Sequence, residues 1–81
     1  MFAQYLIEAV KLKNGVAVDT LDLFTYDSKK DALQEAKDIA QGVSPTSQAL
    51  HGFTDIQVYE CMGDEIGNCY NCEKVARFKV L

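Results

Sequence analysis

The sequence predicts an α+β fold: a four-stranded antiparallel sheet of β-β-α-β-β order with one main helix packed on one face. Two observations favour this fold. Apolar residues recur at helical spacing in the middle of the chain, and the segments on either side of it match as two hairpins. The chain has 81 residues, of which 48% are hydrophobic and 25% charged, so it is not expected to be disordered. Residues 1–81 should therefore form a single domain with one core.

The first two strands are expected over residues 2–12 and 16–24. Lys13-Asn14-Gly15 suits a three-residue hairpin loop, with Gly15 in the left-handed conformation. That loop pairs Leu12 with Val16. The resulting register leaves apolar side chains on both faces of the hairpin.

One face of this hairpin must cover the helix, and the other would then meet water. We expect the second face to be a partner-binding surface, because exposed apolar patches usually mark interfaces. Its residues are Tyr5, Ile7, Leu21 and Leu23. Alternatively, the C-terminal hairpin or the connector 43–52 folds over them. A free strand edge would offer a further docking mode by strand addition.

The helix is predicted to begin after Ser28, which is a good N-cap, and to end at Gly42. Asp31 stands where a capping box has its acidic residue. A short helical turn is expected after Ser44-Pro45. The apolar stripe of the main helix consists of Ala32, Leu33, Ala36, Ile39 and Ala40.

The third and fourth strands are expected over 54–62 and 74–81, joined by a turn at 67–68. Pairing residues whose numbers sum to 134 matches apolar with apolar and charge with opposite charge. The resulting pairs are Ile56 with Phe78, Val58 with Ala76, Asp55 with Lys79, Gln57 with Arg77, and Glu60 with Lys74.

All three cysteines, Cys61, Cys69 and Cys72, lie in one twelve-residue segment. Three thiolates could supply ligands for a structural zinc ion, or two of them could form a disulfide. His51 is a poor fourth zinc ligand, because the intervening strand carries it away from Cys61. Reactive thiols are not expected beside so many acidic residues. We expect free thiols, with the other two interpretations left open.

The net charge and hydropathy of the chain limit the kinds of partner that it is expected to bind. The formal net charge of −4 disfavours non-specific nucleic-acid binding, and no apolar stretch is long enough to span a membrane. No signal peptide is evident, and the odd number of cysteines suits a reducing compartment, so a cytoplasmic location is expected. No catalytic motif is present and there is a single histidine, so we do not expect an enzyme.

Three segments carry a resemblance to a known family. They are Ala3-Gln-Tyr-Leu-Ile-Glu-Ala-Val10, Ala32-Leu-Gln-Glu-Ala-Lys-Asp-Ile-Ala40, and His51-Gly52 leading into Ile56-Gln-Val-Tyr-Glu60. In this layout the chain resembles small phage-encoded proteins, among them a type I-F anti-CRISPR inhibitor family. The resemblance implies a compact protein that works by occupying the surface of another macromolecule.

The expected function is therefore a non-catalytic protein-binding module, in particular a phage or mobile-element inhibitor of a host CRISPR-type defence complex. One alternative is a small zinc-binding adaptor organised by Cys61, Cys69 and Cys72. Another is a homo-oligomeric binder of a small ligand.

Overall fold

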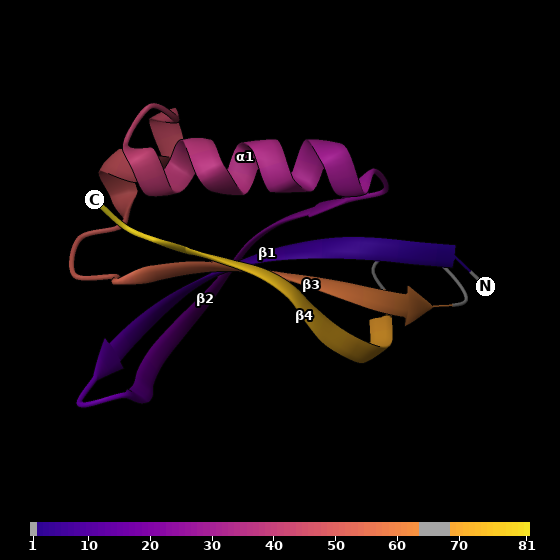
Figure 1. Cartoon of the computed structure of the whole chain (residues 1–81), viewed down its shortest axis with the longest axis horizontal. Coiled ribbons are helices and arrows are strands. Elements are labelled where there is room, and N and C mark those ends of the chain that lie inside the picture. The colour runs from indigo at the N-terminus through magenta and orange to yellow at the C-terminus, as the bar shows by residue number, and fades with distance from the viewer. Residues whose placement is uncertain (1, 64–68) are drawn as a thin grey trace.

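The computed structural model describes residues 2–63 and 69–81, with side chains described for 3–63 and 72–81. It confirms the predicted α+β fold, a four-stranded antiparallel sheet with one helix packed against it (Figure 1). The strand order across the sheet is β2-β1-β3-β4. The elements are β1 (Phe2–Lys13), β2 (Val16–Tyr26), α1 (Lys29–Gln41), the 3-10 helix η1 (Pro45–Ala49), β3 (Asp55–Gly63) and β4 (Cys69–Lys79).

The core lies between α1 and the two central strands. The helix contributes mostly alanines, whose small side chains let it approach the sheet closely. The predicted apolar stripe is confirmed, although Leu33 is only partly buried. The buried residues of this cluster are Ala32, Ala36, Ile39 and Ala40 from α1, Ile7 and Ala9 from β1, Ile56 and Val58 from β3, and Leu50.

Both ends of α1 are capped as the sequence predicts. The Ser28 hydroxyl accepts a hydrogen bond from the backbone N–H of Asp31 at 3.3 Å. Gly42 takes the left-handed conformation with φ of 83° and closes the helix. The backbone N–H of Leu81 donates to the carbonyl of Ala40 at 3.0 Å, which joins the C-terminal residues to the last turn of α1.

The central strand pair is regular, whereas both edge strands are bulged. β1 and β3 pair from Phe2 to Val10 without a register shift. The shifts in the pairing with β1 leave Val18 and Leu23 as extra residues on β2, and β4 carries an extra residue at Val75. Each bulge interrupts the ladder and increases the local twist, which makes an edge a poor template for strand addition.

The first hairpin differs from the prediction. Its loop has two residues, Asn14 and Gly15, both with positive φ (56° and 79°), as in a type I′ turn. Lys13 therefore pairs with Val16, and the predicted three-residue loop and its register are wrong. The type I′ turn matches the twist of the two strands, and the β2 bulges then move the register further.

The second hairpin follows the predicted register from Asp55 to Val58 and then departs from it. The Val75 bulge places Lys74 opposite Tyr59, so the predicted pairing of Lys74 with Glu60 is wrong. β4 also begins at Cys69, earlier than predicted. The turn predicted at 67–68 lies outside the described residues.

Candidate functional site

The four predicted partner-binding residues do not share one exposed face. Ile7 is fully buried beneath α1, and Tyr5 and Leu23 pack partly buried against the same core. Only Leu21 is exposed, at 44%. These four residues therefore do not form an exposed surface together, because α1 packs on the Ile7 face of β1.

An apolar surface does exist on the same hairpin, with a different membership. Four large side chains of β2, which we call the β2 apolar row, are exposed, and their exposure rises toward the hairpin tip. The values are 42% for Phe24, 44% for Leu21, 55% for Val18 and 64% for Val16. Figure 1 shows the reason: the tip of the β1–β2 hairpin runs away from α1.

Two members of the β2 apolar row lie on the same face of the sheet as the core. Leu21 lies opposite Ala9 and Phe24 lies opposite Ile7, which places both on the helix side of the sheet. The rings of Phe24 and Tyr26 lie 6.4 Å apart, and Tyr26 packs against the core. Val16, Val18 and Phe24 are not among the residues predicted from the sequence, although the Asn14-Gly15 pair, which is typical of a two-residue turn, was the signal that could have indicated them.

The face of the sheet opposite α1, which we call the open face, is polar. A shallow groove of about 310 Å³ crosses it and is lined by residues from all four strands. On its floor the Tyr59 hydroxyl donates a hydrogen bond to Gln57 Oε1 at 2.7 Å. Nearby, Arg77 Nε lies 3.5 Å from Asp55 Oδ2. Gln57 and Asp55 are both buried, so the polar groups of this face include buried side chains as well as exposed ones.

Two carboxyl groups meet at the other side of this groove. Partial burial raises the pKa of the Glu8 carboxyl, and the charge and hydrogen bonding of Asp22 raise that pKa further. Lys74 and a hydrogen bond with Tyr59 act on the pKa of Glu8 in the opposite direction. Burial also raises the pKa of the Tyr59 hydroxyl, and Glu8 adds to that effect. Acids on β1 and β2 thus face bases on β4 across the groove.

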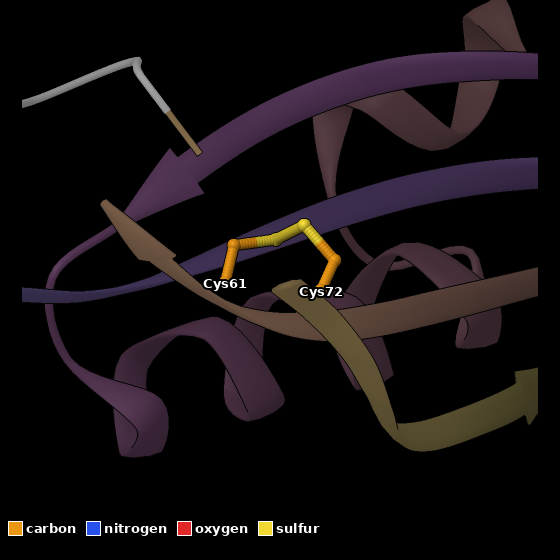
Figure 2. The surroundings of a disulfide bond; sticks show 2 residues. All are labelled: Cys61 and Cys72. Carbon is orange, nitrogen blue, oxygen red and sulfur yellow. A yellow bond between two sulfur atoms is a disulfide. The ribbon is translucent and has the colours of Figure 1, made fainter. Parts of the chain in front are cut away.

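The cysteine segment contains a disulfide. Cys61 of β3 and Cys72 of β4 are bonded, with their Cα atoms 4.0 Å apart (Figure 2). Cys61 is fully buried and Cys72 is exposed. The expectation of free thiols is wrong for this pair, and the alternative in which a bond ties the two arms together is the one observed.

The disulfide also bears on the predicted zinc site of Cys61, Cys69 and Cys72. Zinc binds thiolates, and a sulfur in a disulfide carries no thiolate charge. The side chain of Cys69 lies outside the described residues. Within the part of the chain that the structure describes, no group of three His, Cys, Asp or Glu side chains could hold a metal ion.

Comparison with family models, curated proteins and solved structures found no match to this chain. None of the helices in residues 2–63 and 69–81 is long and apolar enough to cross a membrane. Because two of the three cysteines form a disulfide, their odd number no longer favours a reducing compartment. The cytoplasmic location stays a prediction.

Proposed function

We propose that this chain is a protein-binding module that contacts another protein through the β2 apolar row. The observation that supports the proposal is the exposure of four large apolar side chains, between 42% and 64%, along one strand. Such sets are costly to leave in water and usually mark interaction sites. Leu21 and Phe24 lie on the same face of the sheet as the buried core, opposite Ala9 and Ile7.

The charges beside the row indicate the kind of partner. Asp22 pairs with Glu8 on the opposite face of the sheet, whereas on the face of the row Asp19 pairs with Lys11 and Val16 pairs with Lys13. A partner with apolar side chains bordered by both acidic and basic residues would complement this face. Contact through side chains is favoured over strand addition, because the bulges at Val18 and Leu23 break the backbone ladder of the edge.

Site-specific photo-crosslinking in cells tests the proposal. A benzophenone amino acid at Leu21 should give crosslinked products of higher mass. The same amino acid at Val43 should give none, although Val43 is exposed at 68% and equally apolar. Leu21→Glu should then abolish crosslinking from position 18 in a protein that keeps its circular dichroism spectrum. Equal products from positions 21 and 43 would reject the proposal.

A narrower form of the proposal is inhibition of a CRISPR-type defence complex. It is supported only by the sequence resemblance described above. A phage plating assay in a host with a type I-F system tests it: the chain should restore plaque formation, Leu21→Glu should not, and Val43→Glu should. Unchanged immunity with a stably expressed chain would remove this target and leave the protein-binding proposal standing.

A further inference from the structure

The open face carries rows of side chains that run across all four strands. Directly paired residues lie on the same face of a sheet, so the register defines each row. In order β2-β1-β3-β4, the rows are Thr20–Val10–Asp55–Lys79, Asp22–Glu8–Gln57–Arg77 and Thr25–Leu6–Tyr59–Lys74. Every row ends in a base on β4, and the central row begins with two acids.

This face has no covering layer in the described part of the chain, since α1 and η1 lie on the other side of the sheet (Figure 1). It is nevertheless partly apolar: Leu6, Leu12 and Tyr59 are half-buried, and Val10 is 2% exposed. An uncovered sheet face on which buried and half-buried apolar side chains stand among polar and charged ones suits a second layer.

We propose that the open face is an interface between two copies of this chain, stacked face to face about a twofold axis parallel to the strands. Such an axis lays β2 of one copy over β4 of the other. Asp22 then meets Arg77 of the second copy, and Glu8 meets Gln57 of the second copy. The same contacts occur twice, as an isologous interface requires.

The charge layout distinguishes this arrangement from the other twofold stacking. An axis perpendicular to the strands would lay β2 over β2 and β4 over β4. Asp22 would then meet Asp22 of the second copy, and Arg77 would meet Arg77, so like charges would oppose each other on both margins. Only the axis parallel to the strands pairs opposite charges in the central row.

The surroundings of the Glu8 carboxyl group support the proposal. Its carboxyl lies beside that of Asp22, and the like charge of Asp22 is one cause of its raised pKa. In residues 2–63 and 69–81, the one ion pair within 4.0 Å joins Arg77 to Asp55, so neither Glu8 nor Asp22 has a cation at that distance. A second copy would bring Arg77 over this pair of acids. The product is a four-layered α-β-β-α particle.

Sedimentation velocity over a range of concentrations tests the interface. The wild-type chain should reach twice its 9.0 kDa mass. Asp22→Arg should raise the dissociation constant of the dimer by about tenfold or more, because it places two cations opposite each other at both contacts. Asp19→Arg is the matched control. It makes the same charge change on the same strand, but Asp19 pairs with Lys11 on the helix side, so the dimer should persist.

A charge exchange gives the decisive outcome. Asp22→Arg and Arg77→Asp should each be monomeric alone, and an equimolar mixture should form a heterodimer in which both contacts are again complementary. The Asp22→Arg and Asp19→Arg pair is sufficient if Arg77→Asp destabilises the fold, because both keep the Arg77–Asp55 ion pair. A wild-type chain that stays monomeric at several hundred micromolar, or equal dissociation by Asp19→Arg and Asp22→Arg, would overturn the proposal.

Discussion

Ile7 on β1 lies directly opposite Val58 on β3, and neither side chain exposes any surface to solvent. The pair sits in the regular central part of the sheet, beneath α1. It therefore marks the place where packing contributes most to the stability of this small domain.

Truncating Ile7 should be costly. Ile7→Ala should lower the free energy of unfolding by about 2–5 kcal/mol, because it removes buried methyl groups and leaves a cavity. Val16→Ala is the control: this side chain is 64% exposed, and the change should stay within about 0.5 kcal/mol. Urea denaturation measures both. A small loss at Ile7 would mean that α1 does not cover this strand.

Removing the disulfide should lower stability without changing the fold. Cys61 and Cys72 are 11 residues apart. Closing a loop of that size lowers the conformational entropy of the unfolded chain, which stabilises the folded state by about 3 kcal/mol. Cys61→Ala with Cys72→Ala should lose about that amount relative to the oxidised wild type, and somewhat more because the Cys61 side chain is fully buried. Denaturation with and without a thiol reductant checks this: the wild type should respond to the reductant and the variant should not.

The stability of the chain should depend on the ionisation of Glu8. Its pKa is raised in the folded protein above the ordinary value of 4.5. The folded state therefore favours the protonated form, and this contribution is complete at low pH and is lost as pH rises through the folded pKa. Glu8→Gln should stabilise the protein at pH 7 relative to the wild type, and the difference should shrink toward pH 4.

Denaturant unfolding of the two proteins at several pH values measures this dependence. Asp22→Asn should give a smaller effect of the same sign, because it removes only the neighbouring charge and not the burial of Glu8. A Glu8→Gln advantage that grows on acidification would contradict the prediction.

The N-cap of α1 offers a local test. Ser28→Ala removes the hydroxyl that accepts the hydrogen bond from Asp31 N–H, and should cost about 1 kcal/mol. Ser28→Asp should retain most of the stability, because a carboxylate also accepts this bond and suits the helix N-terminus. Thermal unfolding followed at 222 nm compares the three proteins, and equal midpoints would show that the cap is unimportant.

The elements that the sequence predicts well are those with strong local signals. The helix has an N-cap at Ser28, an apolar stripe between Ala32 and Ala40, and a closing glycine at Gly42. Each of these signals indicates the helix independently of the others. The start of the second hairpin has two independent supports, the apolar pairs and the Asp55–Lys79 and Gln57–Arg77 matches. These signals need no knowledge of the rest of the fold.

The faces of the first hairpin could not be predicted in this way. A shift of one residue moves every side chain to the other face, and β2 contains two such shifts, at Val18 and Leu23. β1 has apolar residues on both faces, Leu6 and Val10 on one and Ile7 and Ala9 on the other. The alternation of apolar and polar residues therefore could not fix the register. The cysteine pairing was equally open, because three cysteines allow three different disulfides.

The irregular edge strands have a consequence for the behaviour of the chain at high concentration. A straight outer strand bearing four exposed apolar side chains would be a template on which further molecules could polymerise into fibrils. In β2 the row of free backbone groups is broken at Val18 and again at Leu23, so an incoming strand finds only short stretches to match. The chain can therefore expose the β2 apolar row to solvent and still resist the growth of amyloid fibrils. Deleting Val18 would remove one of the two breaks, and we expect this variant to form fibrils more readily than the wild-type chain.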